Sequence, residues 1–210
     1  MSKKLPVISH KIKIHVICEG DEEIEYLNSL KELGVWSDKY EVTFKNANGN
    51  GNIFPFYQDA FQMDNYDLIF AFVDTDKCPY STYKNIKLKI NDIYGNDNAT
   101  DFLLLFGNPC TMQIVILHFG YILLESHLKR KNKDIIYKCT GVESYNATEA
   151  KRKALFSLIS VDNYELMKKG LAKLSKNDEE KNSSNFLAFL NNLENDNIKW
   201  IEDLQTKLDI

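Results

Sequence analysis

The sequence has few cysteines, no long apolar run and no excess of basic charge. Its four cysteines lie far apart and form no Cys-x-x-Cys pair, and no secretory leader is expected, so we predict free thiols in a reducing cytoplasm. The most apolar stretch, residues 112–124, is too short to cross a bilayer and is interrupted by His118, which predicts a buried helix and no membrane partner. A net charge of -4 excludes a surface that attracts nucleic acid everywhere.

Any binding of nucleic acid would therefore depend on local basic patches. Three short runs are candidates: Lys84, Lys87 and Lys89; Lys129, Arg130, Lys131 and Lys133; Lys151, Arg152 and Lys153. Such runs are usually solvated faces, so the sequence alone assigns no phosphate contact to any of them.

The first half of the chain alternates short apolar runs with amphipathic stretches, which is typical of β-α-β units and a mostly parallel sheet. We predict strands at residues 13–18, 40–45, 68–73 and 101–106. Helices are predicted at 21–33, 55–63 and 81–93, and another begins at Pro109. The fold class is therefore α/β, with a four-stranded, mostly parallel sheet flanked by helices.

The second half shows no further strand pattern. Helical spacing recurs at residues 147–159, 163–174 and 185–193, separated by polar connectors. We therefore predict one α/β domain over residues 1–142 and a helical C-terminal extension, residues 143–210, packed on it.

Acidic residues follow two of the predicted strands, at the point where each strand ends. Glu19 follows the first strand, and Asp74 and Asp76 follow the strand at 68–73. Side-chain direction repeats every two residues in a strand, so Asp74 and Asp76 should face the same side. If the two strands are neighbours, these acids converge in the crevice where open α/β sheets keep their sites.

Crowded carboxylates without a counter-ion raise one another's pKa, so a bound cation that neutralises their charge is the simplest expectation. Mg²⁺ prefers oxygen ligands and keeps several waters, so a few carboxylates suffice. Glu23 lies one helical turn after Glu19 and is a further candidate ligand. Glu22 and Glu25 are interpreted as ordinary solvated helix acids.

The order of these motifs resembles that of the Toprim superfamily of topoisomerases, primases and nucleases. That superfamily carries Glu-Gly after its first strand, as Glu19-Gly20 here, and Asp-x-Asp after a later strand, as Asp74-Thr75-Asp76 here. The resemblance implies a Toprim-like, Rossmann-like fold. It also implies that Asp74 and Asp76 hold Mg²⁺, or Mn²⁺, with Glu19 as a ligand or general base and Glu23 as a possible second-metal ligand.

Further segments resemble the RloB-like family, whose members are Toprim proteins encoded near restriction and phage-defence genes. The similar segments, which span nearly the whole chain, are Glu19-Gly20 with Glu22 or Glu23, Tyr26-Leu27, Asn108-Pro109-Cys110, His118-Phe119 and residues 182–185. The resemblance implies cleavage of phosphodiester bonds in RNA or DNA by a defence effector acting with an ABC-type or AAA-like ATPase. A homo-oligomer is a further possibility.

One position departs from the RloB-like pattern, in which a glutamate commonly follows Asn-Pro-Cys by two residues. Met112 stands there, with Gln113 next to it as a candidate replacement. Asn108 is expected to cap the helix that begins at Pro109 and to aid anion binding there. His118 could contact phosphate, although a lone histidine in an apolar helix is more often a hydrogen-bonded core residue.

Two alternatives remain open. One is a weakly active or inactive Toprim module that binds a partner ATPase or nucleic acid. The other is a phosphatase of the haloacid-dehalogenase type, which also uses Asp-x-Asp after an apolar strand. That motif expects Thr or Val where Cys78 stands, normally follows the first strand, and leaves Glu19-Gly20 unexplained.

Overall fold

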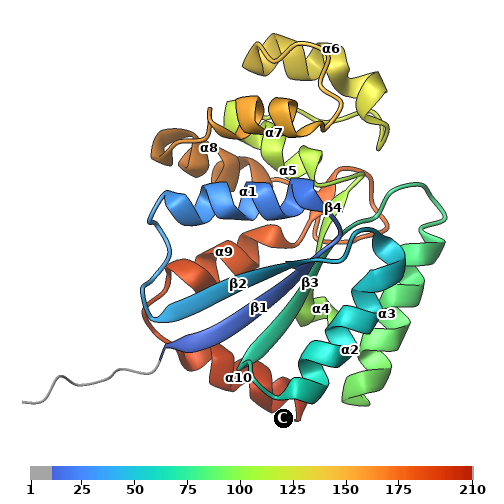
Figure 1. Ribbon diagram of the computed structural model, residues 1–210, viewed down its shortest axis with the longest axis vertical. Coiled ribbons are helices and arrows are strands. Elements are labelled where there is room, and N and C mark those ends of the chain that lie inside the picture. Colours follow the sequence, from blue (N-terminus) through green and yellow to red (C-terminus); the bar gives the residue numbers. More distant parts are fainter. Residues whose placement is uncertain (1–10, 210) are drawn as a thin grey trace, which may run out of the picture.

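A five-stranded sheet forms the centre of the computed structural model, which describes residues 11–209 (Figure 1). The strands are β1 (Ile12–Cys18), β2 (Tyr40–Asn46), β3 (Leu68–Asp74), β4 (Leu104–Asn108) and β5 (Ser183–Ser184). They lie in the order β2-β1-β3-β4-β5, with the first four parallel and β5 antiparallel to β4. The predicted α/β class with a mostly parallel sheet is confirmed.

Helices cover both faces of this sheet, so its central strand is apolar on both sides. All seven residues of β3 are buried. Ile69, Ala71 and Val73 face the core beneath α2 (Ile53–Met63) and α3 (Ser81–Tyr94). Phe70 and Phe72 face the opposite core, beneath α1 (Asp21–Glu32) and α9 (Phe186–Glu194). A continuous apolar run is what such a two-sided position requires.

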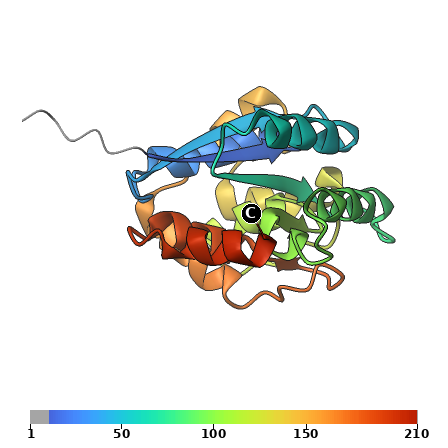
Figure 2. The same cartoon turned by 90° about the horizontal axis from the view of Figure 1, so that it is seen from below.

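The remaining helices extend the layer that contains α1. They are α4 (Thr100–Leu103), α5 (Met112–Ile116), α6 (Lys129–Thr140), α7 (Glu149–Phe156), α8 (Val161–Leu171) and α10 (Lys199–Leu208), with short 3-10 turns at Asn50–Asn52 and Leu117–Phe119. In Figure 1, α5, α7 and α6 rise above α1, while α10 lies near the opposite end of the sheet. Figure 2 shows α10 apart from the pair α2 and α3.

The sheet has five strands rather than the predicted four, and the fifth comes from the segment predicted to be entirely helical. β5 is two serines long, so it has no apolar alternation for a sequence pattern to detect. Side chains hold it in place. Ser184 Oγ donates to the Phe106 carbonyl at 2.7 Å. The Asn185 side chain accepts the Phe106 N–H and donates to the Leu104 carbonyl. Residues 143–209 therefore complete the sheet as well as covering it.

Several predicted boundaries differ from the structure. The predicted strand at 101–106 begins as α4, and β4 starts only at Leu104. The apolar run 112–124 forms α5 and one 3-10 turn, and then leaves helical geometry at Gly120, whose φ is +142°. Helices α6 and α10 were not predicted; α6 has few apolar positions, which weakens its helical periodicity. Among the described residues, no helix is long and apolar enough to span a membrane.

Candidate functional site

The topological switch point of the sheet, where the strand order reverses, lies between β1 and β3. From β1 the chain passes through α1 to β2 on one side, and β3 and β4 lie on the other. Cys18 pairs with Phe72, and the Glu19 backbone N–H donates to the Phe72 carbonyl at 3.1 Å, which continues the pairing past the end of β1. Glu19 and Asp74 thus meet at the carboxyl edge, where α/β sheets form crevices.

Three predicted carboxylates are fixed at this edge by backbone donors. Glu19 Oε2 accepts the Asp74 N–H at 3.1 Å. Glu23, in the first turn of α1, reaches back so that its Oε2 accepts the Gly20 N–H at 2.9 Å. This bond satisfies an N–H that the helix start would otherwise leave unpaired.

Asp74 is held by the turn that follows β4. Its Oδ1 accepts both the backbone N–H of Thr111 at 2.6 Å and the Thr111 hydroxyl at 2.7 Å. Its Oδ2 accepts no hydrogen bond within residues 11–209. The side chain is only 8% exposed, so Asp74 is a buried carboxylate with one oxygen anchored and the other unoccupied by protein donors.

Asp76 does not extend the strand as expected. β3 ends at Asp74, and Asp76 has left-handed backbone geometry with a φ of +59°, so the two-residue alternation no longer sets its direction. Its Oδ2 lies 3.4 Å from Asn50 Nδ2, and the Asn50 amide lies between Asp76 and the Glu19 carboxylate. The Asn50 amide therefore lies between two predicted ligands and can donate to either one of them, depending on its orientation, although no sequence pattern singled it out.

The structure gathers Glu19, Glu23 and Asp74 around one crevice of about 420 Å³. Asp76 borders an adjoining hollow of about 310 Å³, which shares Asp74 with the crevice. Glu19 and Glu23 therefore lie on one side of Asp74 and Asp76 on the other. The four acids do not all face a single cavity.

The interpretation of Glu22 as a solvated helix acid is wrong. Its side chain is 6% exposed, it forms an ion pair with Lys129, and it accepts the Tyr145 hydroxyl at 2.5 Å. Glu25 is partly covered as well and pairs with Arg152 at 2.7 Å. The segment carrying α6 and α7 folds over the start of α1, a tertiary contact that helical spacing could not reveal.

Burial and mutual repulsion make the crevice unfavourable for three negative charges. Burial raises the pKa of Glu19 to about 8, and repulsion from Glu23 adds to it. Burial also raises the pKa of Glu23 to about 7, with Glu22 the next contributor. The pKa of Asp74 rises well above its usual range because of burial, then Glu23 and Glu19. The crevice without a bound cation therefore retains protons at neutral pH.

Two cationic side chains, Lys129 and Arg152, line the same crevice. Lys129 lines it from the start of α6, and burial lowers the pKa of its ammonium group. Attraction to Glu22, Asp74 and Glu23 outweighs burial, so the net effect raises that pKa. Lys129 is the first residue of one predicted basic run, which brings a fixed positive charge beside the carboxylates.

The three accessory candidates lie in different surroundings. Asn108 is 1% exposed and donates to the Asp178 carbonyl at 2.9 Å, while its Oδ1 has no partner. Gln113 is fully buried, with its amide bonded to the backbone of Ile122 and Leu124.

His118 also lies in the core, between the Tyr26 hydroxyl at 3.1 Å and Asn163 Oδ1 at 3.0 Å. Burial lowers its pKa to about 4, so the ring is neutral at physiological pH. These contacts match the hydrogen-bonded core histidine that the sequence favoured over a phosphate contact.

Oxygen donors of the carboxylate type are the ones that Mg²⁺ and Mn²⁺ prefer. Within residues 11–209, no three His, Cys, Asp or Glu side chains already stand in a ligating arrangement. Binding an ion in the crevice would therefore require Glu19 or Glu23 to change rotamer, while Asp74 already has one oxygen without a donor.

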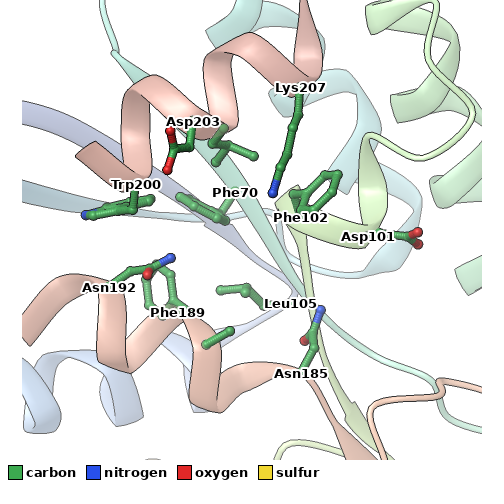
Figure 3. Close-up of a pocket in the computed structure, with 12 residues that line it drawn as sticks. Phe70, Asp101, Phe102, Leu105, Asn185, Phe189, Asn192, Trp200, Asp203 and Lys207 are labelled. Carbon is green, nitrogen blue, oxygen red and sulfur yellow. The ribbon is translucent and has the colours of Figure 1, made fainter. Parts of the chain in front are cut away.

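A separate hollow of about 260 Å³ lies between α9, α10 and the sheet (Figure 3). Aromatic rings such as Phe70, Phe189 and Trp200 line it, with Asp203 and Lys207 at its border. None of the predicted site residues contributes to it, so we place the candidate site at the crevice.

Comparisons of the chain with protein-family models, with curated proteins and with solved structures found no match.

Proposed function

We propose that this chain is a Toprim-like, Mg²⁺-dependent phosphodiesterase that cleaves RNA or DNA. The observation that carries the proposal is the convergence of Glu19, Glu23 and Asp74 at the β1/β3 edge, with the pKa of each carboxyl raised. Carboxylates that repel one another in a buried crevice gain stability when a divalent cation replaces their protons.

The residues present fit a hard divalent cation. Asp74 is held rigidly through one oxygen and offers the other, and Glu19 and Glu23 are long enough to turn toward it. Asp76 would supply a ligand from the adjoining hollow, and the Asn50 amide would donate to either the Asp76 or the Glu19 carboxylate. A bound Mg²⁺ or Mn²⁺ ion would polarise the phosphate and lower the pKa of a coordinated water.

The protein groups have separate tasks in this proposal. Thr111 holds Asp74 in place, and Gly20 holds Glu23. Lys129 stands beside the carboxylates and would offset charge on a phosphate entering the crevice. Glu19, the most exposed of the three carboxylates, would accept the proton of the attacking water once cation binding has lowered its pKa.

The resemblance to RloB-like proteins supports a further part of the proposal. The chain would act in the cytoplasm, where its free thiols persist, as the effector of an anti-phage pair with an ATPase. The partner would supply sensing and position the substrate.

A second candidate is a Toprim module with weak or no activity, and Met112 favours it. The residue in the position of the family glutamate is 1% exposed and packed in the core, so it brings no oxygen to the crevice. The neighbouring Gln113 amide is bonded to backbone groups.

The test combines ion binding with cleavage. We expect purified protein to bind Mn²⁺ by calorimetry and to cleave labelled single-stranded RNA or DNA in Mg²⁺ but not in EDTA. Asp74→Asn should keep the Thr111 hydrogen bonds and lose both activities, whereas Glu202→Gln, an exposed change on α10, should lose neither.

Three outcomes separate the readings. Equal Mn²⁺ binding by Asp74→Asn and the wild type would refute the site. Mn²⁺ binding without cleavage of any RNA or DNA, even with the ATPase partner, would favour the inactive module. Turnover of p-nitrophenyl phosphate with a phosphorylated Asp74 would favour the phosphatase.

A further inference from the structure

Helix α6 is the most basic element of a protein whose net charge is negative. Its twelve residues carry five cationic side chains and one acidic one, while the whole chain has a net charge of -4. Charge of one sign gathered on one helix creates a local field that the net charge of the protein conceals.

Four of the five cations of α6 lie on its outer face. Asn132 and Ile136 are buried beneath the helix, and Ile135 and Cys139 are partly buried beside them. The exposed residues are Arg130, Lys131, Lys133, Asp134, Tyr137 and Lys138. In Figure 1, α6 is the outermost helix at its end of the molecule, with no other element above it.

Four of these cations have no acidic partner. Within residues 11–209, the ion pair of Lys129 with Glu22 is the one that involves α6. Some lysines elsewhere, such as Lys87 and Lys168, are paired with carboxylates at 2.6 and 2.5 Å. The positive charge on the outer face of α6 is therefore not neutralised by the protein itself.

An exposed aromatic ring stands among these cations. Tyr137 is 50% exposed and is the only large hydrophobic side chain on the outer face of α6. Arg130, Lys133 and Tyr137 follow one another at helical spacings of three and four residues, so they share one stripe. A membrane-binding helix would instead carry a broad apolar face.

The first turn of α6 connects this stripe to the candidate site. Lys129 lines the crevice that contains Glu19 and Asp74, and the rest of the helix leads away from it. At a rise of about 1.5 Å per residue, Tyr137 lies about 12 Å along the helix from Lys129.

We infer that the outer face of α6 binds a single strand of nucleic acid and guides it into the crevice. Arg130, Lys131, Lys133 and Lys138 contact phosphates of the strand, and Tyr137 stacks against a base that is accessible only in an unpaired strand. The inference rests on the proposed phosphodiesterase function and adds the surface that holds its substrate.

Binding measured without turnover tests this surface. In EDTA, fluorescence anisotropy with a labelled 12-nucleotide single strand compares the wild type, Arg130→Glu/Lys133→Glu and Lys199→Glu/Lys207→Glu. Both double variants change the net charge equally, but the second pair lies on α10, near the opposite end of the sheet. We expect at least tenfold weaker binding for the α6 pair and less than twofold for the α10 pair.

Tyr137→Ala separates stacking from charge. It should weaken binding of the single strand by about fivefold to a hundredfold, since stacking is worth about 1–3 kcal/mol per base, and it should leave binding of a blunt duplex unchanged. In cleavage assays the α6 variants should raise KM and leave kcat unchanged. Circular dichroism confirms that each variant is folded.

The outcomes distinguish the surface from the activity. A wild type that cleaves nucleic acid, with equal binding by the two double variants, would refute the α6 surface and leave the proposed function standing. A wild type that neither binds nor cleaves nucleic acid would refute both. Binding to phosphatidylserine vesicles in place of nucleic acid would assign the surface to a membrane and overturn the inference.

Discussion

Replacing Glu19 by glutamine removes one ionisable group from the crevice without changing its size. Burial and repulsion from Glu23 raise the pKa of Glu19 from 4.5 to about 8 in the folded protein. A carboxyl group whose folded pKa is raised binds more protons when folded than when unfolded across this interval. The folded protein therefore loses stability as pH rises from 4.5 to 8.

The size of the effect follows from the two pKa values. The raised pKa of Glu19 lowers the free energy of unfolding by about 2 kcal/mol at pH 6 and by about 4 kcal/mol at pH 8. Each pKa unit between the folded and unfolded states corresponds to about 1.4 kcal/mol. The glutamine amide keeps an oxygen for the Asp74 N–H, and its NH₂ can donate to Asn50 once the Asn50 amide turns its oxygen toward position 19. Glu19→Gln should therefore stabilise the metal-free protein.

Thermal unfolding in EDTA at pH 6 and pH 8 measures this difference. The melting temperature of Glu19→Gln should exceed that of the wild type, and the excess should be roughly 4–8 °C larger at pH 8 than at pH 6. Adding Mg²⁺ at pH 8 should raise the melting temperature of the wild type more than that of the variant, since only the wild type offers the full set of carboxylates. Glu202→Gln, on exposed α10, should behave as the wild type throughout.

Two results would refute this reasoning. One is a variant that melts at or below the wild type at pH 8, which would mean that Glu19 is not destabilised by its surroundings. The other is an excess that is the same at both pH values, which would assign the stabilisation to packing instead of charge.

Three further predictions concern other parts of the structure. Tyr145→Phe removes a donor from buried Glu22 and should lower the free energy of unfolding in urea by about 1–3 kcal/mol; an unchanged value would mean that this hydrogen bond is not formed. Asn185→Ala leaves two backbone groups of β4 without partners and should cost about 2–4 kcal/mol by the same assay, against less than 0.5 kcal/mol for Asn191→Ala, an exposed position on α9. Burial lowers the pKa of His118 from 6.5 to about 4, so the free energy of unfolding should fall by about 3 kcal/mol as the pH drops from above 6.5 to 4. His118→Gln should reduce this fall, and a variant with the pH profile of the wild type would show that His118 is not the buried neutral group.

The parallel part of the sheet could be predicted because its strands carry their own signal. β1 and β3 are short, largely apolar and rich in β-branched or aromatic residues; Glu19 directly follows β1, and β3 ends at Asp74. β5 could not be predicted, because two serines held by the side chains of Ser184 and Asn185 leave no periodic trace.

The sequence likewise predicted the part of the candidate site that lies at strand ends, but not the part contributed by loops and helix starts. Glu19 and Asp74 stand at strand ends, so the parallel sheet alone brings them together. Thr111, Asn50 and Lys129 come from loops or helix starts that are far away in sequence, and nothing local marks their proximity. Glu22 was misinterpreted for the same reason, since its partners Lys129 and Tyr145 lie more than a hundred residues later.

The two-residue strand β5 has a consequence for how the chain is synthesised and kept from aggregating. Until Ser184 and Asn185 leave the ribosome, β4 presents an open edge whose backbone groups could pair with another chain. Nearly eighty residues separate Phe106 from Asn185, so this edge closes late and by a long-range contact. A fragment that stops near residue 142 would keep the crevice acids but expose that edge, and would tend to self-associate.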